Sequence, residues 1–185
     1  MSGALSRRQA LAGSLAFAFS VGGLESWLTP REARAAQADY RVLDAAEVRT
    51  LEAFGETLLP GAREAGIAHF VDQQLAAPPE DCLLMIRYLD IAPPYLDFYR
   101  PALAALDAYS LTTQQARFAE LTPEAASAVV EVLSRSVPEG WQAAPAPLFF
   151  FVARSDAVDV VYGTVEGFAK LGIPYMPHIM PARRW

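Results

Sequence analysis

Three residues near the C-terminus, Met176, His178 and Met180, have the types and the spacing of copper ligands. They alternate along a proline-containing segment, and alternate side chains of an extended chain point in the same direction. Thioether and imidazole groups suit Cu(I). The set provides only three ligands, however, and the prolines favour an arm that lies against another surface. A stand-alone periplasmic metal-binding protein or enzyme that uses His69, His178 and the methionines is therefore the alternative interpretation of the chain.

The other reactive side chains do not form a recognisable catalytic site. One cysteine and two histidines exclude an internal disulfide, a CxxCH haem site and a thiolate zinc site. Cys82 lies among apolar residues and is predicted to occupy the core, with a bond to another chain as the minor alternative. The sequence contains no GxGxxG, Walker, GxSxG or HExxH motif. A net charge of −6 without basic clusters argues against nucleic acid as the main partner.

His69 and the acidic pairs favour structural roles. His69 lies early on a predicted helix, where a capping or contact role is more common than catalysis. Acidic pairs at helical spacing, such as Glu52 and Glu56, are typical of a solvated face, and we interpret Asp156 and Asp159 in the same way. We therefore predict no catalytic residue, no cofactor-binding residue and no metal ligand on this chain.

Residues 1–38 are interpreted as an export signal. Arg7 and Arg8 precede a mildly apolar stretch over residues 10–24, which as a helix would rise about 22 Å and fall short of the roughly 30 Å bilayer core. Small residues then give A-x-A cleavage patterns that end at Ala35 and at Ala38. The adjacent arginines resemble a twin-arginine signal, which would engage the twin-arginine translocase and carry a folded protein to the periplasm. An ordinary Sec signal is the alternative.

Residues 39–185 predict an all-α fold, a single irregular helical bundle with an extended C-terminal arm rich in proline and aromatic residues. Asp44 and Glu47 form a capping box, and Thr122 precedes a proline at a first helical position. The apolar periodicity predicts further helices over residues 66–76, 81–91 and 95–109. A second capping-box pattern at Thr112 and Gln115 predicts a short helix over residues 112–118, and a long helical stretch is predicted over residues 148–161. No strand is predicted.

Aromatic residues are dense in residues 141–185. Three consecutive phenylalanines on one helix must point around most of its circumference, so only part of the set can face the chain's own core. Aromatic, proline-stiffened segments are typical interface anchors, although the rest of the chain could also cover them. We predict a partner interface that contains Trp141, Phe149, Phe150, Phe151, Tyr162, Phe168, Pro174, Tyr175, His178 and Trp185.

Several segments together resemble the gluconate 2-dehydrogenase subunit 3 family, the small or gamma subunits of membrane-bound flavin-dependent sugar and polyol dehydrogenases. The resemblance includes the start at Arg7-Arg8, the run Leu58-Leu59-Pro60 and the segment 60–67 after it. It continues through residues 118–124 and reaches Leu171-Gly172-Ile173-Pro174. Residues 175–185 depart from any pattern that we can connect with the family.

The resemblance implies a non-catalytic subunit of a periplasmic, membrane-associated dehydrogenase complex. A large flavoprotein subunit would carry FAD and oxidise a sugar, sugar acid or polyol. A multihaem cytochrome c subunit would carry haem and pass electrons onward. The small subunit would hold no cofactor; it would supply the export signal for the flavoprotein and stabilise it in a chaperone-like role. An assembly factor that leaves the mature complex is a further possibility. The sequence does not identify the substrate, because substrate contacts would lie on another chain.

Overall fold

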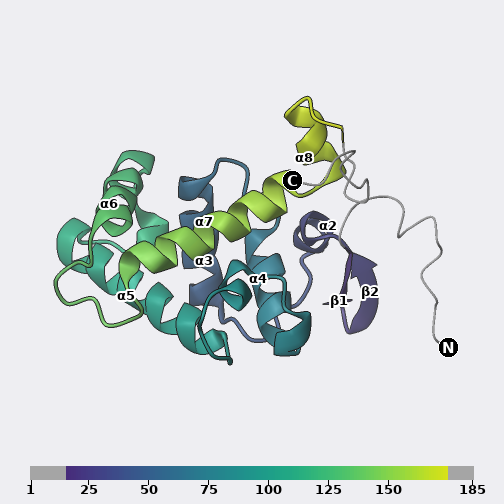
Figure 1. Ribbon diagram of the computed structural model, residues 1–185, viewed down its shortest axis with the longest axis horizontal. Coiled ribbons are helices and arrows are strands. Elements are labelled where there is room, and N and C mark those ends of the chain that lie inside the picture. Colours follow the sequence, from purple (N-terminus) through teal and green to yellow (C-terminus); the bar gives the residue numbers. More distant parts are fainter. Residues whose placement is uncertain (1–15, 175–185) are drawn as a thin grey trace, which may run out of the picture.

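The computed structural model describes residues 16–174 and is mostly helical (Figure 1), which confirms the all-α prediction. The α-helices of this described part are α2 (Pro30–Ala35), α3 (Ala45–Leu58), α4 (Ile67–Ala76), α5 (Leu96–Gln114), α6 (Pro123–Arg135), α7 (Ala146–Tyr162) and α8 (Val165–Lys170). Short 3-10 turns are η1 (Pro79–Asp81), η2 (Met85–Tyr88) and η3 (Phe118–Glu120). The strands β1 (Phe17–Val21) and β2 (Leu24–Leu28) form one antiparallel hairpin.

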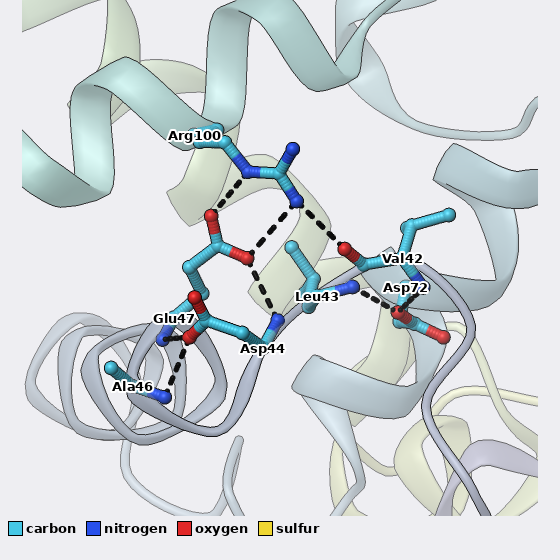
Figure 2. A network of polar contacts seen from close by, with 7 residues as sticks. All are labelled: Val42, Leu43, Asp44, Ala46, Glu47, Asp72 and Arg100. Atoms are coloured by element: carbon cyan, nitrogen blue, oxygen red, sulfur yellow. Dashed lines mark hydrogen bonds and ion pairs between the residues drawn. The ribbon is translucent and has the colours of Figure 1, made fainter.

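The predicted capping residues begin their helices as expected. The Asp44 side chain accepts hydrogen bonds from the backbone N–H groups of Ala46 and Glu47, and the Glu47 carboxylate accepts from the N–H of Asp44. Arg100 of α5 binds the same Glu47 carboxylate and the carbonyl of Val42, so α5 is tied to the start of α3 (Figure 2). At α6, Thr122 accepts from the N–H of Ala125. Satisfied first-turn donors fix where these helices start.

A buried carboxylate on α4 holds the segment that leads into α3. Asp72 is 2% exposed, and its two oxygens accept the N–H groups of Arg41, Val42 and Leu43 at 2.8, 2.9 and 2.8 Å. Figure 2 shows this contact beside the cap of α3. Irregular backbone thus obtains the partners that a helix or sheet would otherwise supply.

Helix α7 crosses the middle of the molecule in Figure 1 and contacts α3, α4, α5, α6 and α8. Phe149 lies in the first turn of α7 and is fully buried. Its ring stacks on Phe54 of α3 at 5.0 Å between centroids and meets Phe98 and Tyr99 of α5 at 6.1 and 6.2 Å. These aromatic contacts join three helices into one core.

Two of the predicted helices are wrong. Residues 81–91 form irregular chain with two 3-10 turns, because side chains of other elements take their backbone donors: Gln74 accepts from Leu83, and Asp156 accepts from Met85. No separate helix covers 112–118, since α5 continues to Gln114. The Thr112 hydroxyl donates back to the carbonyl of Ala108 inside α5 instead of capping a new helix.

The β1–β2 hairpin was not predicted from the sequence. Residues 17–28 lie in the apolar stretch interpreted as a signal, but Gly22 and Gly23 have φ of 55° and 80° and close a two-residue turn. Such left-handed pairs match the twist of antiparallel strands. Phe19 faces inward at 2% exposure, whereas Leu24 and Trp27 of β2 are exposed. In Figure 1 the hairpin lies next to α2, at the end of the molecule away from α6.

Candidate partner interface

The three consecutive phenylalanines of α7 have different surroundings. Phe149 is fully buried, Phe150 is half-buried and Phe151 is 45% exposed. The structure therefore corrects the assignment of Phe149, because a ring enclosed by α3, α5 and α7 belongs to the protein's own core. Helical geometry gives the reason: successive residues are about 100° apart around the axis, so neighbours in sequence occupy different faces.

The outer face of α7, defined here by Phe151, Val158 and Tyr162, is the strongest interface candidate on the described chain. Their spacing of seven and four residues puts them on one side of the helix. Phe151 and Val158 are 45% and 39% exposed, and Tyr162 is half-buried. Three further apolar residues stay exposed after α7: Val165, Leu171 and Ile173. Apolar side chains that recur on one solvent-facing side are typical of a binding surface.

The other predicted interface residues are only partly available. Trp141 is half-buried, and its indole N–H donates to the carbonyl of Ala144 at 2.7 Å. Phe168 is half-buried on α8, and Pro174 is exposed. Several predicted residues lie outside the described part of the chain: Arg7, Arg8, Tyr175, Met176, His178, Met180 and Trp185.

Other exposed apolar residues lie away from α7. Leu24 and Trp27 of the hairpin are 74% and 56% exposed, Tyr88 is 67% exposed, and Leu111 of α5 is 45% exposed. These positions were not among the predicted interface residues. Strand alternation around the Gly22-Gly23 turn would have placed Leu24 opposite Val21 and Trp27 opposite Ala18.

A buried polar cluster lies on the inner face of α7. Asp156 is fully buried; one oxygen accepts the N–H of Met85 at 2.9 Å, and the other accepts the hydroxyl proton of Tyr99. Burial raises the pKa of Asp156 to about 7, and burial beside this carboxyl raises the pKa of Tyr99. The predicted solvated position of Asp156 is thus wrong. Its oxygens tie η2 and α5 to α7, and its place on the buried side of α7 could have been found from helical spacing.

Cys82 and His69, the two reactive residues inside the described range, are both buried. Cys82 is fully enclosed, which confirms the core prediction, and burial raises the pKa of its thiol.

Burial lowers the pKa of His69. Its Nε2 is 3.2 Å from the carbonyl of Ala38, which can only accept, so the proton is assigned to Nε2. Nδ1 then accepts from the Tyr40 hydroxyl at 3.1 Å. His69 is a neutral link between α4 and residues 38–40.

An open polar hollow of about 690 Å³ lies beside His69, where it is also lined by Arg34, Tyr40 and Glu52. Arg34 and Glu52 form an ion pair across it at 3.3 Å.

Within residues 16–174 no group of three or more His, Cys, Asp or Glu side chains is arranged to hold a metal ion. In the same part of the chain no helix is both long and apolar enough to cross a bilayer.

Comparison with models of protein families identifies the family of the chain. The family model described as gluconate 2-dehydrogenase subunit 3 matches residues 45–180, and the chain belongs to this family. The match begins at the first residue of α3, so the hairpin and α2 lie outside it. Neither the curated proteins nor the solved structures contain a match to the chain.

Proposed function

We propose that this member of the gluconate 2-dehydrogenase subunit 3 family is the non-catalytic small subunit of a periplasmic, membrane-associated, FAD-dependent sugar, sugar-acid or polyol dehydrogenase. Its work is to bind the large flavoprotein subunit, stabilise it and carry it through the twin-arginine translocase. FAD resides on the large subunit and haem on a multihaem cytochrome c subunit. The family match over residues 45–180 is the observation that carries the proposal.

The outer face of α7 supplies a surface for this role. Phe151 and Val158 expose apolar area on a helix whose opposite side is locked into the core. A helix that is already packed into the core presents these side chains on an ordered backbone, so binding need not order the backbone, which favours association. We assign this face to the flavoprotein, with Tyr162 at its edge.

Export of the pair depends on Arg7 and Arg8. The planar guanidinium groups of paired arginines make directed hydrogen bonds that a lysine ammonium cannot reproduce. The flavoprotein crosses the membrane in this scheme because it is bound to the folded small subunit.

The test is to change both Arg7 and Arg8 to Lys in cells that produce the two subunits together. We expect the flavoprotein and its dehydrogenase activity to disappear from the periplasmic fraction. Arg154→Lys, a conservative change at an exposed position of α7, is the matched control and should leave export unchanged. A flavoprotein that still reaches the periplasm with the double variant would refute the export role. A purified small subunit that neither copurifies with nor stabilises the flavoprotein would refute the binding role.

A further inference from the structure

The segment that resembles the end of an export signal is folded onto the domain. We call residues 17–38 the leader module; it consists of the β1–β2 hairpin, α2 and the turn after it. Phe19, Ala33 and Ala38 form a small core of their own at 2%, 0% and 3% exposure. The Phe17 ring lies 6.1 Å from Phe70 of α4. The module thus has an interior and rests on α4.

The ring of His69 is covered by the same module. Its centroid lies 6.1 Å from that of Phe19, and its Nε2 binds the carbonyl of Ala38. A buried imidazole without partners would cost free energy. Removal of residues 17–38 would therefore expose the aromatic face of α4 and leave the Nε2 proton of His69 without its acceptor.

The turn before α4 leaves room for α2 to pack closely against it. Gly66, just before α4, has φ of 85°, and a Cβ there would lie 2.1 Å from the carbonyl oxygen of Pro30. Only glycine permits this close approach. Around it, Arg31 pairs with Glu64. The turn before α4 therefore accommodates α2 through a close backbone approach and through an ion pair.

The hairpin is also tied to the residues that follow the module. The Arg41 guanidinium donates to the carbonyl of Ala18 at 2.7 Å, and the Ser20 hydroxyl donates to Asp39 at 2.7 Å. The N–H of Asp39 donates to the carbonyl of Ser20 at 2.8 Å. These bonds close the module back on residues 39–41.

Both A-x-A patterns end inside this structure. Ala35 is the last residue of α2. The N–H of Ala38 donates to the carbonyl of Ala33 at 2.9 Å, while its own carbonyl is held by His69. A protease that takes its substrate as an added extended strand needs these same backbone groups free. Cleavage after either alanine therefore requires the module to open first.

We propose that the leader module stays on the protein after export as a permanent part of the fold, and that signal peptidase does not cut after Ala35 or Ala38. The inference rests on the proposed twin-arginine export, because that route carries a chain whose module is already docked. The exported protein then keeps Trp27 and Leu24 on its surface and His69 covered.

A cleavage assay on purified components tests the protection without any export step. The full-length chain and a synthetic peptide of residues 1–45 are each incubated with a soluble signal peptidase, and the products are measured by intact mass. We expect no product that starts at residue 36 or 39 from the folded chain. A folded chain cut at the rate of the peptide would overturn the inference. A peptide that is itself resistant would support retention, because the bond is then no substrate in either form.

Two substitutions in the hairpin separate docking from sequence preference. Phe19→Asp places a charge in the buried cluster, whereas Leu24→Asp introduces the same group at a 74% exposed position; both lie away from the cleavage bonds. We expect Phe19→Asp to lower Tm by several degrees and Leu24→Asp to leave it unchanged. Where the peptide is cut, Phe19→Asp should also make the chain cleavable. Equal Tm values for the two variants would overturn the docked module.

The N-terminus of the exported protein gives the decisive result in cells. We expect intact mass of the chain from the periplasmic fraction to show an N-terminus before Phe17. A chain that begins at Ala36 or Asp39 would overturn retention. If no chain reaches the periplasm, the export role in the proposed function fails, while the purified-component assay still decides whether the folded module resists cleavage.

Discussion

The two faces of α7 differ although their sequences look alike. Phe149 and Phe151 are two residues apart, yet the first is fully buried in an aromatic stack and the second is 45% exposed. The inner face also holds Asp156 with both oxygens bonded, whereas the outer face exposes Val158. The comparison shows that a helix divides a run of aromatic residues between a buried side and an exposed side, because neighbours in sequence are about 100° apart around its axis.

The largest effect is expected from removing the inner aromatic ring. Phe149→Ala should lower the free energy of unfolding by about 3–5 kcal/mol, because a cavity replaces contacts with three rings. Phe151→Ala, the matched change on the outer face, should cost less than about 1 kcal/mol. Urea denaturation of both variants measures the difference. Equal losses would mean that the outer face is packed as tightly as the inner one.

A smaller effect, in binding and not in stability, is expected from charging the outer face. The double variant Phe151→Asp with Val158→Asp should weaken binding to the flavoprotein by about 2 kcal/mol or more, roughly thirtyfold in Kd. Its Tm should stay close to that of the unchanged protein. Leu111→Asp on α5 is the control, because Leu111 and Phe151 are both 45% exposed. Copurification and titration with the flavoprotein provide the readout. Loss of binding with Leu111→Asp alone would move the interface to α5.

The last effect, which is the smallest when counted per pH unit, concerns how the free energy of unfolding depends on pH. Burial raises the pKa of Asp156 from 3.8 to about 7, so between these values the folded state holds a proton that the unfolded state releases. The free energy of unfolding therefore falls as pH rises through this window, by at most about 1.4 kcal/mol per pH unit.

Asp156→Asn removes this titration, and the variant should gain stability relative to the unchanged protein as pH rises from 4 to 7. His69, whose pKa burial lowers, works in the opposite direction, since its contribution is lost as pH falls; it is present in both proteins and cancels. Urea denaturation across the pH range measures the slopes. Phe151→Ala should follow the unchanged protein, and identical slopes for Asp156→Asn would show that Asp156 does not titrate there.

The sequence predicted those parts of the fold that are decided by neighbouring residues. Asp44 with Glu47, and Thr122 before Pro123, begin α3 and α6 because capping needs only side chains within one turn. The long helical stretch predicted over residues 148–161 corresponds to α7. The placement of Cys82 in the core followed from the apolar residues around it.

The remaining features depend on contacts between distant residues. Residues 81–91 were predicted as a helix, but Gln74 and Asp156 claim their backbone donors from other elements. The hairpin was missed because an apolar run after two arginines indicated a signal, while the paired glycines at 22 and 23 turn it back on itself. Which of the three phenylalanines would be buried required the position of α3 and α5 around α7.

The thiol of Cys82 can be used to detect transient opening of the core by chemical labelling. It is the single thiol of the chain and is fully enclosed, and its raised pKa keeps it protonated. A thiol reagent can react only after η2 and its surroundings separate, since the thiolate is the reactive form and needs solvent access. The rate at which a thiol reagent labels Cys82 therefore reports how often the interior of the protein opens.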